Sequence, residues 1–266
     1  MKPSVLITGA YGGMGLATAR ALRGCGYRVF ALDRCVGAEE EDILPIEADI
    51  TDENSVEAAF RQVREQTDAL FAIIHFAGIY LLDSLVEMEH EAFERIFHIN
   101  LGGAFLVNKT FLPLLNAGSR IVITTSELAP LDPLPFTGIY AVTKGALDKY
   151  AYSLRMELQL LDISVSGLRA GAVATGMLGV STDALDRFCE KTERYTCNAD
   201  RFRQIVDRVE ARSVTPERIA DKVIRILNKR SPRFAYRINR NPLLLMLHFL
   251  PQGMQCRIIK QVLKTK

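Results

Sequence analysis

Short apolar runs alternate with amphipathic helical patterns along almost the whole chain, and this alternation limits the fold more than any other feature. Several runs are nearly all apolar, as expected of parallel strands that are covered by helices on both faces. The repeated order of strand, helix and strand predicts a parallel sheet with right-handed crossovers. The seven runs are SVLITG (residues 4–9), YRVFALD (27–33), LPIEAD (44–49), LFAIIHFAG (70–78), RIVITTS (120–126), ISVSGLRAG (163–171) and RFAYRI (233–238).

The helical patterns between the runs complete this prediction. One of them starts with a capping residue, Thr51 or Asp52. The chain shows no internal repeat, low-complexity linker or break in composition, so we expect residues 1–266 to form a single α/β domain with a doubly wound (Rossmann) sheet of about seven strands. Two parts fall outside the alternation, residues 176–213 and the tail 241–266. The predicted helices cover residues 14–24, 52–66, 88–115, 140–161 and 216–229.

The composition argues against several classes of function. The chain has 33 basic and 31 acidic side chains, and the dispersed charge predicts no nucleic-acid partner. Five scattered cysteines without a CxxC pair favour a reducing, cytoplasmic location over a disulfide framework or a zinc site. The four histidines show no spacing typical of metal ligands, so no metal is expected. The longest apolar stretch, residues 243–250, is far shorter than the ~20 residues that span a bilayer.

A glycine-rich turn follows the first apolar run. The stretch TGAYGGMG has the spacing T-G-x-x-x-G-x-G, formed by Thr8, Gly9, Gly13 and Gly15. Glycine permits positive φ and the close approach of another group to the backbone, and a helix that begins there offers free N–H groups to a phosphate. In a doubly wound sheet, ligands bind beyond the carboxyl ends of the strands. The turn therefore predicts a nucleotide site, with a purely structural turn as the alternative.

Acidic residues at the ends of the second and third runs extend this prediction. Asp33 lies 18 residues after Gly15, close to the spacing at which an acid binds the ribose hydroxyls of a dinucleotide. Its carboxylate repels a 2′-phosphate, so we expect NAD(H) in preference to NADP(H). The neighbouring Arg34 leaves NADP(H) open, because a guanidinium binds phosphate. Asp49 is expected either to contact the adenine edge or to cap the next helix.

The segment YAVTK places Tyr140 and Lys144 on one face at the start of a predicted helix. A tyrosine acts as a base near neutrality only if its pKa falls by about 3 from an ordinary value of ~10. A lysine ammonium on the next turn supplies part of that effect. Ser126 ends the preceding run, where a hydroxyl can hold a substrate oxygen. A buried aromatic, a solvated lysine and a turn-capping serine form the structural alternative.

In combination, these motifs resemble the short-chain dehydrogenase/reductase family over essentially the whole chain. The resemblance implies that TGAYGGMG is the cofactor turn and that Asp49 contacts adenine. It implies that Ser126, Tyr140 and Lys144 are catalytic. Asn100, in HINLGGAFLV, matches the asparagine with which family members hold a proton-relay water.

The segment RAGAVAT matches the family's motif after the sixth strand. Ala170 stands in the place of the family's proline, Gly171 is kept, and Thr175 lies where the family contacts the nicotinamide carboxamide. The resemblance implies that further residues of these turns contact the cofactor. These are Tyr11, Met14, Ile50, Ala77, Gly78 and Val173.

The chain departs from the family pattern at two points. The family's N-N-A-G reads HFAG here, so His75 and Phe76 replace both asparagines, which puts the local sheet geometry in question. The spacing of 14 residues between Ser126 and Tyr140 is one longer than expected, which leaves Thr125 as an alternative to the serine. The prolines in the intervening PLDPLPF suggest a rigid wall beside the substrate.

The resemblance implies hydride transfer between the nicotinamide and a secondary alcohol or ketone. In that reaction Tyr140 exchanges the proton and Ser126 holds the substrate oxygen. Lys144 lowers the pKa of the tyrosine and binds ribose hydroxyls, while Asn100 links this lysine to solvent through water. An NADPH-dependent carbonyl or acyl-chain reductase is the alternative among enzymes. A non-catalytic NAD(H)-sensing protein is the alternative of another class, and the presence of all four residues argues against it.

Residues 176–213 lie where this family places its substrate lid, and their apolar side chains are expected to close over a hydrophobic small molecule. The tail 241–266 loosely resembles the same region of family members that act on steroids and retinoids. Its apolar cluster can wall a hydrophobic pocket, form a subunit contact or rest on a membrane surface, and packing or a subunit contact is favoured over membrane attachment. Family members usually pair through the helices at 88–115 and 140–161, so we expect a homodimer or a homotetramer. The lid's apolar residues are Met177, Leu178, Leu185, Phe188, Tyr195, Phe202 and Ile205.

Overall fold

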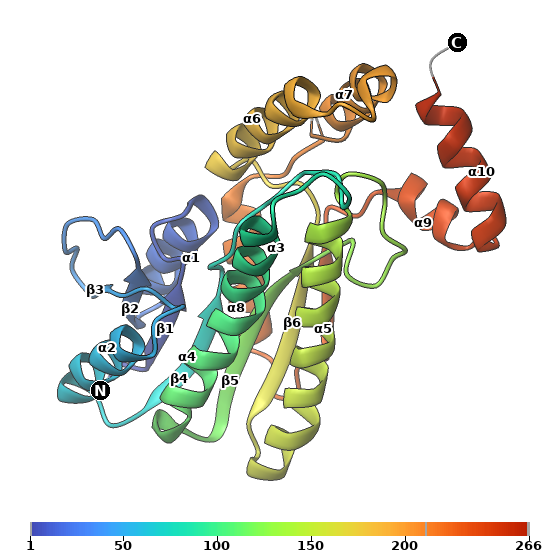
Figure 1. The fold of residues 1–266 in the computed structure, drawn as a ribbon. Helices are drawn as coiled ribbons and strands as arrows, with labels where there is room; N and C mark the ends of the chain where they lie inside the picture. The colour runs from blue at the N-terminus through green and yellow to red at the C-terminus, as the bar shows by residue number, and fades with distance from the viewer. Residues whose placement is uncertain (1, 211, 265–266) are drawn as a thin grey trace.

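In the described part of the chain, seven parallel strands form one sheet, as the alternation of apolar runs predicts. The computed structural model describes residues 2–210 and 212–264, and it describes only the backbone of residues 177–182, 197, 200 and 207–210. The strand order is β3-β2-β1-β4-β5-β6-β7 (Figure 1), as in a doubly wound (Rossmann) sheet. Each predicted run overlaps one strand. The strands are β1 (Ser4–Thr8), β2 (Arg28–Asp33), β3 (Ile43–Glu47), β4 (Leu70–His75), β5 (Leu115–Ser126), β6 (Ser164–Ala170) and β7 (Ala235–Ile238).

Different helices cover the two faces of the sheet, because side chains alternate between the faces along each strand. In β1, Leu6 packs into a core with α2, α4 and α5, whereas Val5 and Ile7 pack into a second core with α1 and α8. Burial on both faces explains why the runs are nearly all apolar. The covering helices are α1 (Gly13–Gly24), α2 (Glu53–Gln66), α4 (Gly103–Phe111), α5 (Gly138–Leu158) and α8 (Pro216–Leu227).

The strand order reverses at β1, which pairs with β2 on one side and with β4 on the other. Thr8 of β1 is in register with His75 of β4, and Ser126 of β5 is in register with Ala170 of β6. The loops that follow these four strands therefore leave from one edge of the sheet. This edge is where doubly wound sheets bind ligands.

The helix predicted over residues 88–115 runs without interruption from His90 to Phe111. Helix α3 covers His90–Phe97, a π-helical turn covers His98–Gly102, and α4 follows. The predicted helix is confirmed, and the π-helical turn in its middle is the feature that the sequence did not indicate. A π-helical turn widens the helix locally and is often found at functional sites. Here it contains the buried Asn100, whose Nδ2 donates to the carbonyl of Ile79 at 3.0 Å.

Residues 176–213, which fall outside the alternation of runs and helical patterns, contain the helices α6 (Gly176–Lys191) and α7 (Thr196–Glu210). The tail contains α9 (Pro242–His248) and α10 (Gln252–Leu263). Figure 1 shows α6 and α7 across the top of the molecule, with α9 and α10 at its right-hand side. Within residues 2–210 and 212–264, no helix is long and apolar enough to cross a membrane. The cytoplasmic location stays a prediction.

Aromatic side chains join α6 and α7 to the loop before α5. The ring centroid of Phe136 lies 4.5 Å from that of Phe188 and 5.1 Å from that of Phe202. Leu185 is buried in the same cluster. Several apolar side chains of the lid therefore pack against this loop. Of the predicted lid residues, Met177 and Leu178 lie outside the described side chains.

An ion pair between Asp148 and Arg169 fastens α5 to β6. The two side chains are 8% and 13% exposed, and Asp148 Oδ2 lies 2.6 Å from an Nη atom of Arg169. The second carboxylate oxygen accepts from Arg169 Nε at 2.9 Å and from Thr125 Oγ1 at 3.2 Å. The pair is therefore buried, bidentate and further hydrogen bonded.

We expect Asp148→Ala to lower the free energy of unfolding by about 3–5 kcal/mol, because it leaves a buried guanidinium without a counter-charge. Urea unfolding followed by circular dichroism measures the change. The double variant Asp148→Leu with Arg169→Met is the matched control, since it removes both charges, and it should recover most of the loss. Wild-type stability of Asp148→Ala would show that the pair does not hold α5 on β6.

Candidate active site

The glycine turn after β1 brings two segments of backbone too close together for side chains. Gly9 has φ +66°, and a Cβ on it would lie 2.6 Å from the backbone nitrogen of Ala77. A Cβ on Gly13 would lie 2.8 Å from Thr175 Cγ2, and one on Gly15 would overlap the carbonyl of Gly9. The glycines are thus required by the packing of the turn against β4 and the segment after β6.

The amino terminus of α1 opens beside this turn. No side chain caps the helix at Gly12, and its first turn contains no acidic residue. A cavity of about 760 Å³ lies in front of it. The free N–H groups and the helix dipole together favour an anion such as a pyrophosphate. The chain's own geometry therefore fits a dinucleotide at this place.

Asp33 lies at the end of β2 in the wall of the same cavity. Its Oδ2 accepts from the backbone N–H of Tyr11 at 2.9 Å, and its Oδ1 accepts from that of Arg34 at 2.8 Å. The carboxylate is held in place and keeps further acceptor capacity for ligand hydroxyls. The side chain of Arg34 is exposed at the cavity and forms no ion pair within the described residues.

Asp49 also lines this cavity, after β3. Its Oδ1 accepts from the backbone N–H of Thr51 at 2.9 Å and from the hydroxyl of Thr51 at 2.6 Å, and these bonds lower the pKa of the carboxyl. The capping of α2 falls instead to Asp52, which accepts from the backbone N–H groups of Asn54 and Ser55. The helix-capping alternative for Asp49 was therefore wrong, and so was Thr51 as the cap.

The structure gathers most of the predicted cofactor residues around this cavity. Thr8 does not line it, because it is buried in β1, where its carbonyl accepts from the N–H groups of Phe76 and Ala77. Gly171 and Val173 line the neighbouring cavity instead. The predicted residues that line the 760 Å³ cavity are Gly9, Tyr11, Gly13, Met14, Gly15, Asp33, Arg34, Asp49, Ile50, Ala77, Gly78 and Thr175.

A second cavity, of about 240 Å³, contains the three predicted catalytic residues. Ser126 ends β5, Tyr140 lies in the first turn of α5, and Lys144 follows one turn later. Ser126 is hydrogen bonded to Tyr140, and the Nζ atom of Lys144 lies 5.8 Å from the centre of the Tyr140 ring. Thr125 donates to Asp148 instead. Ser126 is therefore better placed than Thr125 to share a substrate oxygen with the tyrosine.

Burial controls the protonation of both titratable groups at this site. Burial raises the pKa of Tyr140, Tyr80 raises it further, and the hydrogen bond from Ser126 lowers it. Burial lowers the pKa of Lys144 to about 8, although its Nζ donates to the carbonyl of Thr124 at 3.4 Å. The tyrosine of the free protein is thus a protonated acid. The resemblance implies a lowered pKa for Tyr140, and this stays a prediction for the protein with its cofactor bound.

Asn100 and Lys144 both lie close to Gly78. Asn100 Oδ1 accepts from the N–H of Ile79 at 2.8 Å, and Asn100 Nδ2 donates to Thr143 Oγ1 at 3.1 Å. A Cβ on Gly78 would lie 3.0 Å from Asn100 Oδ1 and 3.3 Å from Lys144 Nζ. The missing side chain at Gly78 therefore lets both polar groups approach the same point of the backbone.

His75, which replaces an asparagine of the family pattern, supplies its own hydrogen bonds. Its Nε2 lies 2.9 Å from Asn108 Oδ1, and its Nδ1 lies 3.4 Å from Thr8 Oγ1. Asn108 donates in turn to the hydroxyl of Tyr150 at 3.2 Å. These contacts join β4 to β1, α4 and α5, so the sheet keeps its pairing at this point.

Sequence reasoning missed several residues that line the catalytic cavity. The ring of Tyr80 packs 4.8 Å from that of Tyr140, centroid to centroid. Glu127 lines the cavity, burial raises its pKa, and it accepts from the backbone N–H of Asn241 at 2.6 Å. Leu244 reaches the cavity from the tail. Two signals were available in the sequence: Glu127 directly follows Ser126, and the apolar tail that contains Leu244 was one of the predicted walls of a hydrophobic pocket.

Comparisons with known proteins identify the family. Residues 3–186 match the family model of the short chain dehydrogenases, so the chain belongs to the short-chain dehydrogenase/reductase family. The relatives that the chain matches are named as dehydrogenases and reductases, and one solved structure of the same fold contains NADH. The match to the family model covers the glycine turn, Asn100, Ser126, Tyr140 and Lys144.

Individual relatives differ in substrate and cofactor. Estradiol 17-beta-dehydrogenase 2 of Mus musculus is 31% identical over 200 residues, which are 70% of this chain and 52% of that enzyme, so the match spans about half of the relative's length. NADPH-dependent 1-acyldihydroxyacetone phosphate reductase of Schizosaccharomyces pombe is 28% identical over 68% of this chain and 64% of that enzyme. The structure of 3-ketoacyl-(acyl-carrier-protein) reductase from Brucella melitensis with NADH has a TM-score of 0.72 at 21% identity, over 89% of this chain and 96% of that one.

The buried His75 generates a pH dependence of stability. Burial lowers the pKa of His75 from 6.5 to about 4, although the hydrogen bond that Asn108 Oδ1 accepts from the ring acts to raise it. The unfolded chain therefore binds more protons than the folded protein between these two values. We expect stability to fall as the pH falls through this range, by about 3 kcal/mol in total.

Urea unfolding at a series of pH values measures this effect. His75→Asn is the matched control, because an amide retains a donor and an acceptor but does not titrate. The difference in unfolding free energy between wild type and His75→Asn should change with pH by the same ~3 kcal/mol. A difference that is independent of pH would contradict the assignment.

Proposed function

We propose that this chain is an NAD(H)-dependent oxidoreductase that interconverts a secondary alcohol and a ketone on a hydrophobic substrate. The observation that carries the proposal is the meeting of two cavities, one lined by the glycine turn and one by Ser126, Tyr140 and Lys144. A cofactor in the first cavity would thus reach the catalytic side chains in the second. The residues that line both cavities are Met14, Phe76, Gly78, Tyr80 and Thr175.

The chain's own residues would manage the proton and the substrate oxygen. When bound, the nicotinamide supplies or accepts the hydride. Tyr140, kept protonated by burial, donates a proton to the oxygen of a ketone in the reductive direction and takes it back in oxidation. Ser126 holds the same oxygen through its hydroxyl. Lys144 carries a positive charge below a pKa of about 8, which lowers the cost of forming the phenolate.

Asn100 would connect this lysine to solvent through a water. Its amide is fixed by the backbone of Ile79 and by Thr143, so it presents a constant acceptor close to Gly78 and Lys144. The gathering of all four polar side chains favours an enzyme over a protein that only senses NAD(H). A protein that only senses NAD(H) needs the glycine turn but does not need a proton donor such as Tyr140.

The lining of the catalytic cavity supports a hydrophobic substrate. Apolar side chains reach it from the loop after β5, from α7 and from the tail, whereas the lid's Arg201 and Arg203 are bound to Val262 and Asp186. The names of the relatives include a steroid and two acyl compounds, which agrees with a steroid-, retinoid- or lipid-like molecule. The apolar residues concerned are Leu128, Leu134, Phe202, Ile205, Val206 and Leu244.

The carboxylate of Asp33 supports NAD(H) as the cofactor. It lies in the cofactor cavity at the end of β2, where a 2′-phosphate would meet a like charge. The alternative, an NADPH-dependent carbonyl or acyl-chain reductase, is favoured by Arg34, which is exposed at the same cavity. Because Asp33 and Arg34 have opposite charges, substitution of each in turn can distinguish an NAD(H)-dependent enzyme from an NADPH-dependent one.

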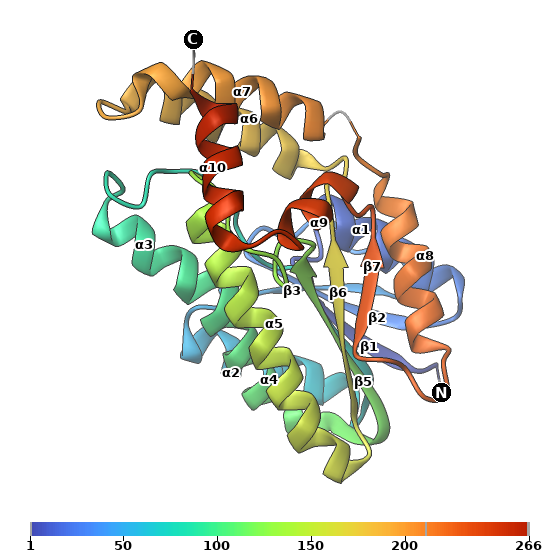
Figure 2. The same ribbon diagram turned by 90° about the vertical axis from the view of Figure 1, so that its right-hand side faces the viewer.

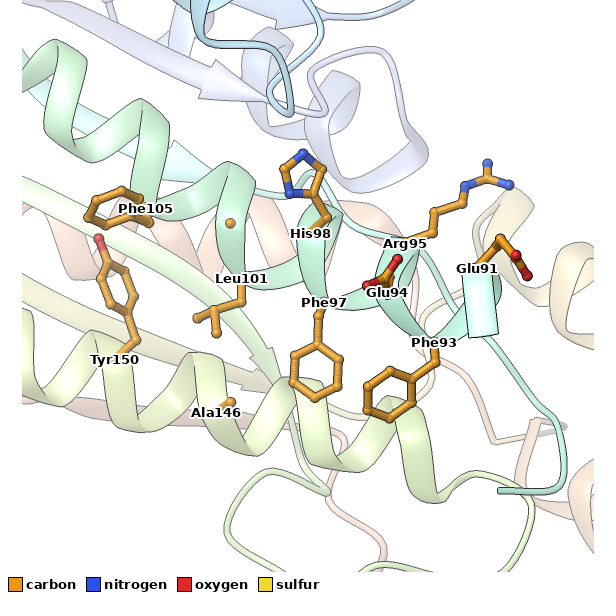
Figure 3. A pocket seen from close by; sticks show the side chains of 11 residues that line it. Glu91, Phe93, Glu94, Arg95, Phe97, His98, Leu101, Phe105, Ala146 and Tyr150 are labelled. Atoms are coloured by element: carbon orange, nitrogen blue, oxygen red, sulfur yellow. The ribbon is translucent and has the colours of Figure 1, made fainter. Parts of the chain in front are cut away.

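A groove between α3, α4 and α5 supports the proposal of a homodimer or a homotetramer. Figure 3 shows Phe93 and Phe97 pointing from α3 towards α5, with Tyr150 pointing from α5 towards Phe105. Phe93 and Phe105 are exposed large hydrophobic residues, and the groove measures about 980 Å³. A second copy of the chain would cover these aromatic rings, as the resemblance implies for these helices.

We expect Tyr140→Phe to lower turnover of a hydrophobic ketone by about a hundredfold or more, because it removes the proton donor. The substitution should leave NADH binding unchanged, as followed by NADH fluorescence. Tyr150→Phe on the same helix is the matched control, since it loses a hydroxyl outside the cavity and should turn over normally. Near-normal turnover of Tyr140→Phe would remove the tyrosine from the mechanism.

We expect Asp33→Asn to improve NADPH binding relative to NADH by about fivefold or more, because it removes a like charge from the 2′-phosphate. The amide oxygen of this variant can still accept from the backbone N–H of Tyr11 in the glycine turn. Fluorescence titration with each reduced cofactor measures the ratio of the two affinities, and Arg34→Gln is the companion variant. An unchanged ratio in Asp33→Asn, with a loss of NADPH binding in Arg34→Gln, would establish the NADPH reading instead.

A further inference from the structure

Helix α9 is apolar on both sides, yet only one side is covered. Leu244 and Leu247 face the loop after β5, and Leu244 also lines the catalytic cavity. At a spacing of three residues along the opposite side, Leu243, Met246 and Phe249 are 65%, 67% and 76% exposed. Large apolar side chains gathered in this way on a surface indicate an interaction site.

The helix is held firmly in this orientation. Asp132, in the loop after β5, accepts from Gln255 Nε2 at 2.9 Å, and His248 Nδ1 lies 2.9 Å from the same carboxylate oxygen. Farther along, the carbonyl of Leu263 accepts from Asn198 of α7 at 2.6 Å. The orientation of α9, and with it the exposed side, is therefore fixed by contacts with the rest of the protein. Figure 2 shows α9 and α10 together on the face turned to the viewer.

The charge is strongly uneven along the chain, and the part that contains α9 and α10 is basic. Residues 222–266 contain eleven basic residues and no Asp or Glu, whereas residues 1–221 contain 22 basic and 31 acidic residues. On α10 and just beyond it, Arg257, Lys260 and Lys264 are exposed and form no ion pair within the described residues. Arg240, just before α9, is exposed as well. A near-neutral total charge conceals this asymmetry.

We propose that α9 and α10 dock the protein on the surface of an anionic phospholipid bilayer. The exposed apolar side chains of α9 would enter the boundary between headgroups and acyl chains, and the basic side chains of α10 would contact the phosphates. A second copy of the chain fits less well, because a symmetric contact would bring the unpaired basic residues together. Since Leu244 lines the catalytic cavity, this docking would place the cavity next to the lipid phase.

Flotation of the full chain with vesicles tests the proposal without cofactor or substrate, so its failure leaves the proposed chemistry untouched. The protein should float with vesicles of phosphatidylcholine mixed with phosphatidylglycerol, and far less with phosphatidylcholine alone. Met246→Ser and Phe249→Ser should each weaken binding by roughly tenfold, through the loss of buried apolar area. Arg257→Gln and Lys260→Gln should each weaken it about fivefold, and on the anionic vesicles only.

Leu160→Ser is the matched control, because Leu160 is 81% exposed in the turn after α5 and lies outside the tail. It should float like the wild type, and thermal melting checks that every variant is folded. The proposal is overturned if the wild type does not float with anionic vesicles, or if Phe249→Ser floats unchanged. It is also overturned if light scattering without vesicles shows that Phe249→Ser separates two subunits, which would make this face a contact between copies.

Discussion

The close approach of the glycine turn to β4 is the contact on which both cavities depend. Gly9 can lie against the backbone of Ala77 because it has no Cβ and adopts a positive φ. This contact orients the amino terminus of α1 towards the cofactor cavity. The next residue, Gly78, leaves room in the same way for Asn100 and Lys144. The absence of side chains at Gly9 and Gly78 thus lets the cofactor cavity and the cavity of Tyr140 and Lys144 lie next to each other.

The loop between β5 and α5 has a comparable role for the substrate side. It begins directly after Ser126 and leads into the helix that carries Tyr140. On the way, Asp132 binds the tail and Phe136 packs against the lid. The catalytic serine and tyrosine, the lid and the tail are therefore all attached to one loop. If the tail docks on a bilayer, the same loop would join the membrane contact to the catalytic residues.

The local pattern of the chain was sufficient to predict the sheet and the order of the site. Parallel strands that are buried on both faces must be apolar throughout, so all seven runs were visible. The predicted catalytic and cofactor residues lie directly after strands or at helix starts, where motif spacing is short. For this reason Ser126, Tyr140, Lys144 and most of the glycine turn were found, and the structure gathers them around two adjoining cavities.

Contacts between distant segments decided the rest. The role of His75 depends on Asn108 and Thr8, which lie 33 and 67 residues away in the chain. The side-chain amide of Asn100, in the π-helical turn, is bound by Ile79 and by Thr143, which lie 21 and 43 residues away in the chain. Periodicity could show that the tail is apolar, but not which side of α9 would be covered, because that depends on the loop it packs against. The sequence alone determined the sheet and which residues gather at the candidate site, whereas packing between distant segments determined the helices of the lid and the exposed side of the tail.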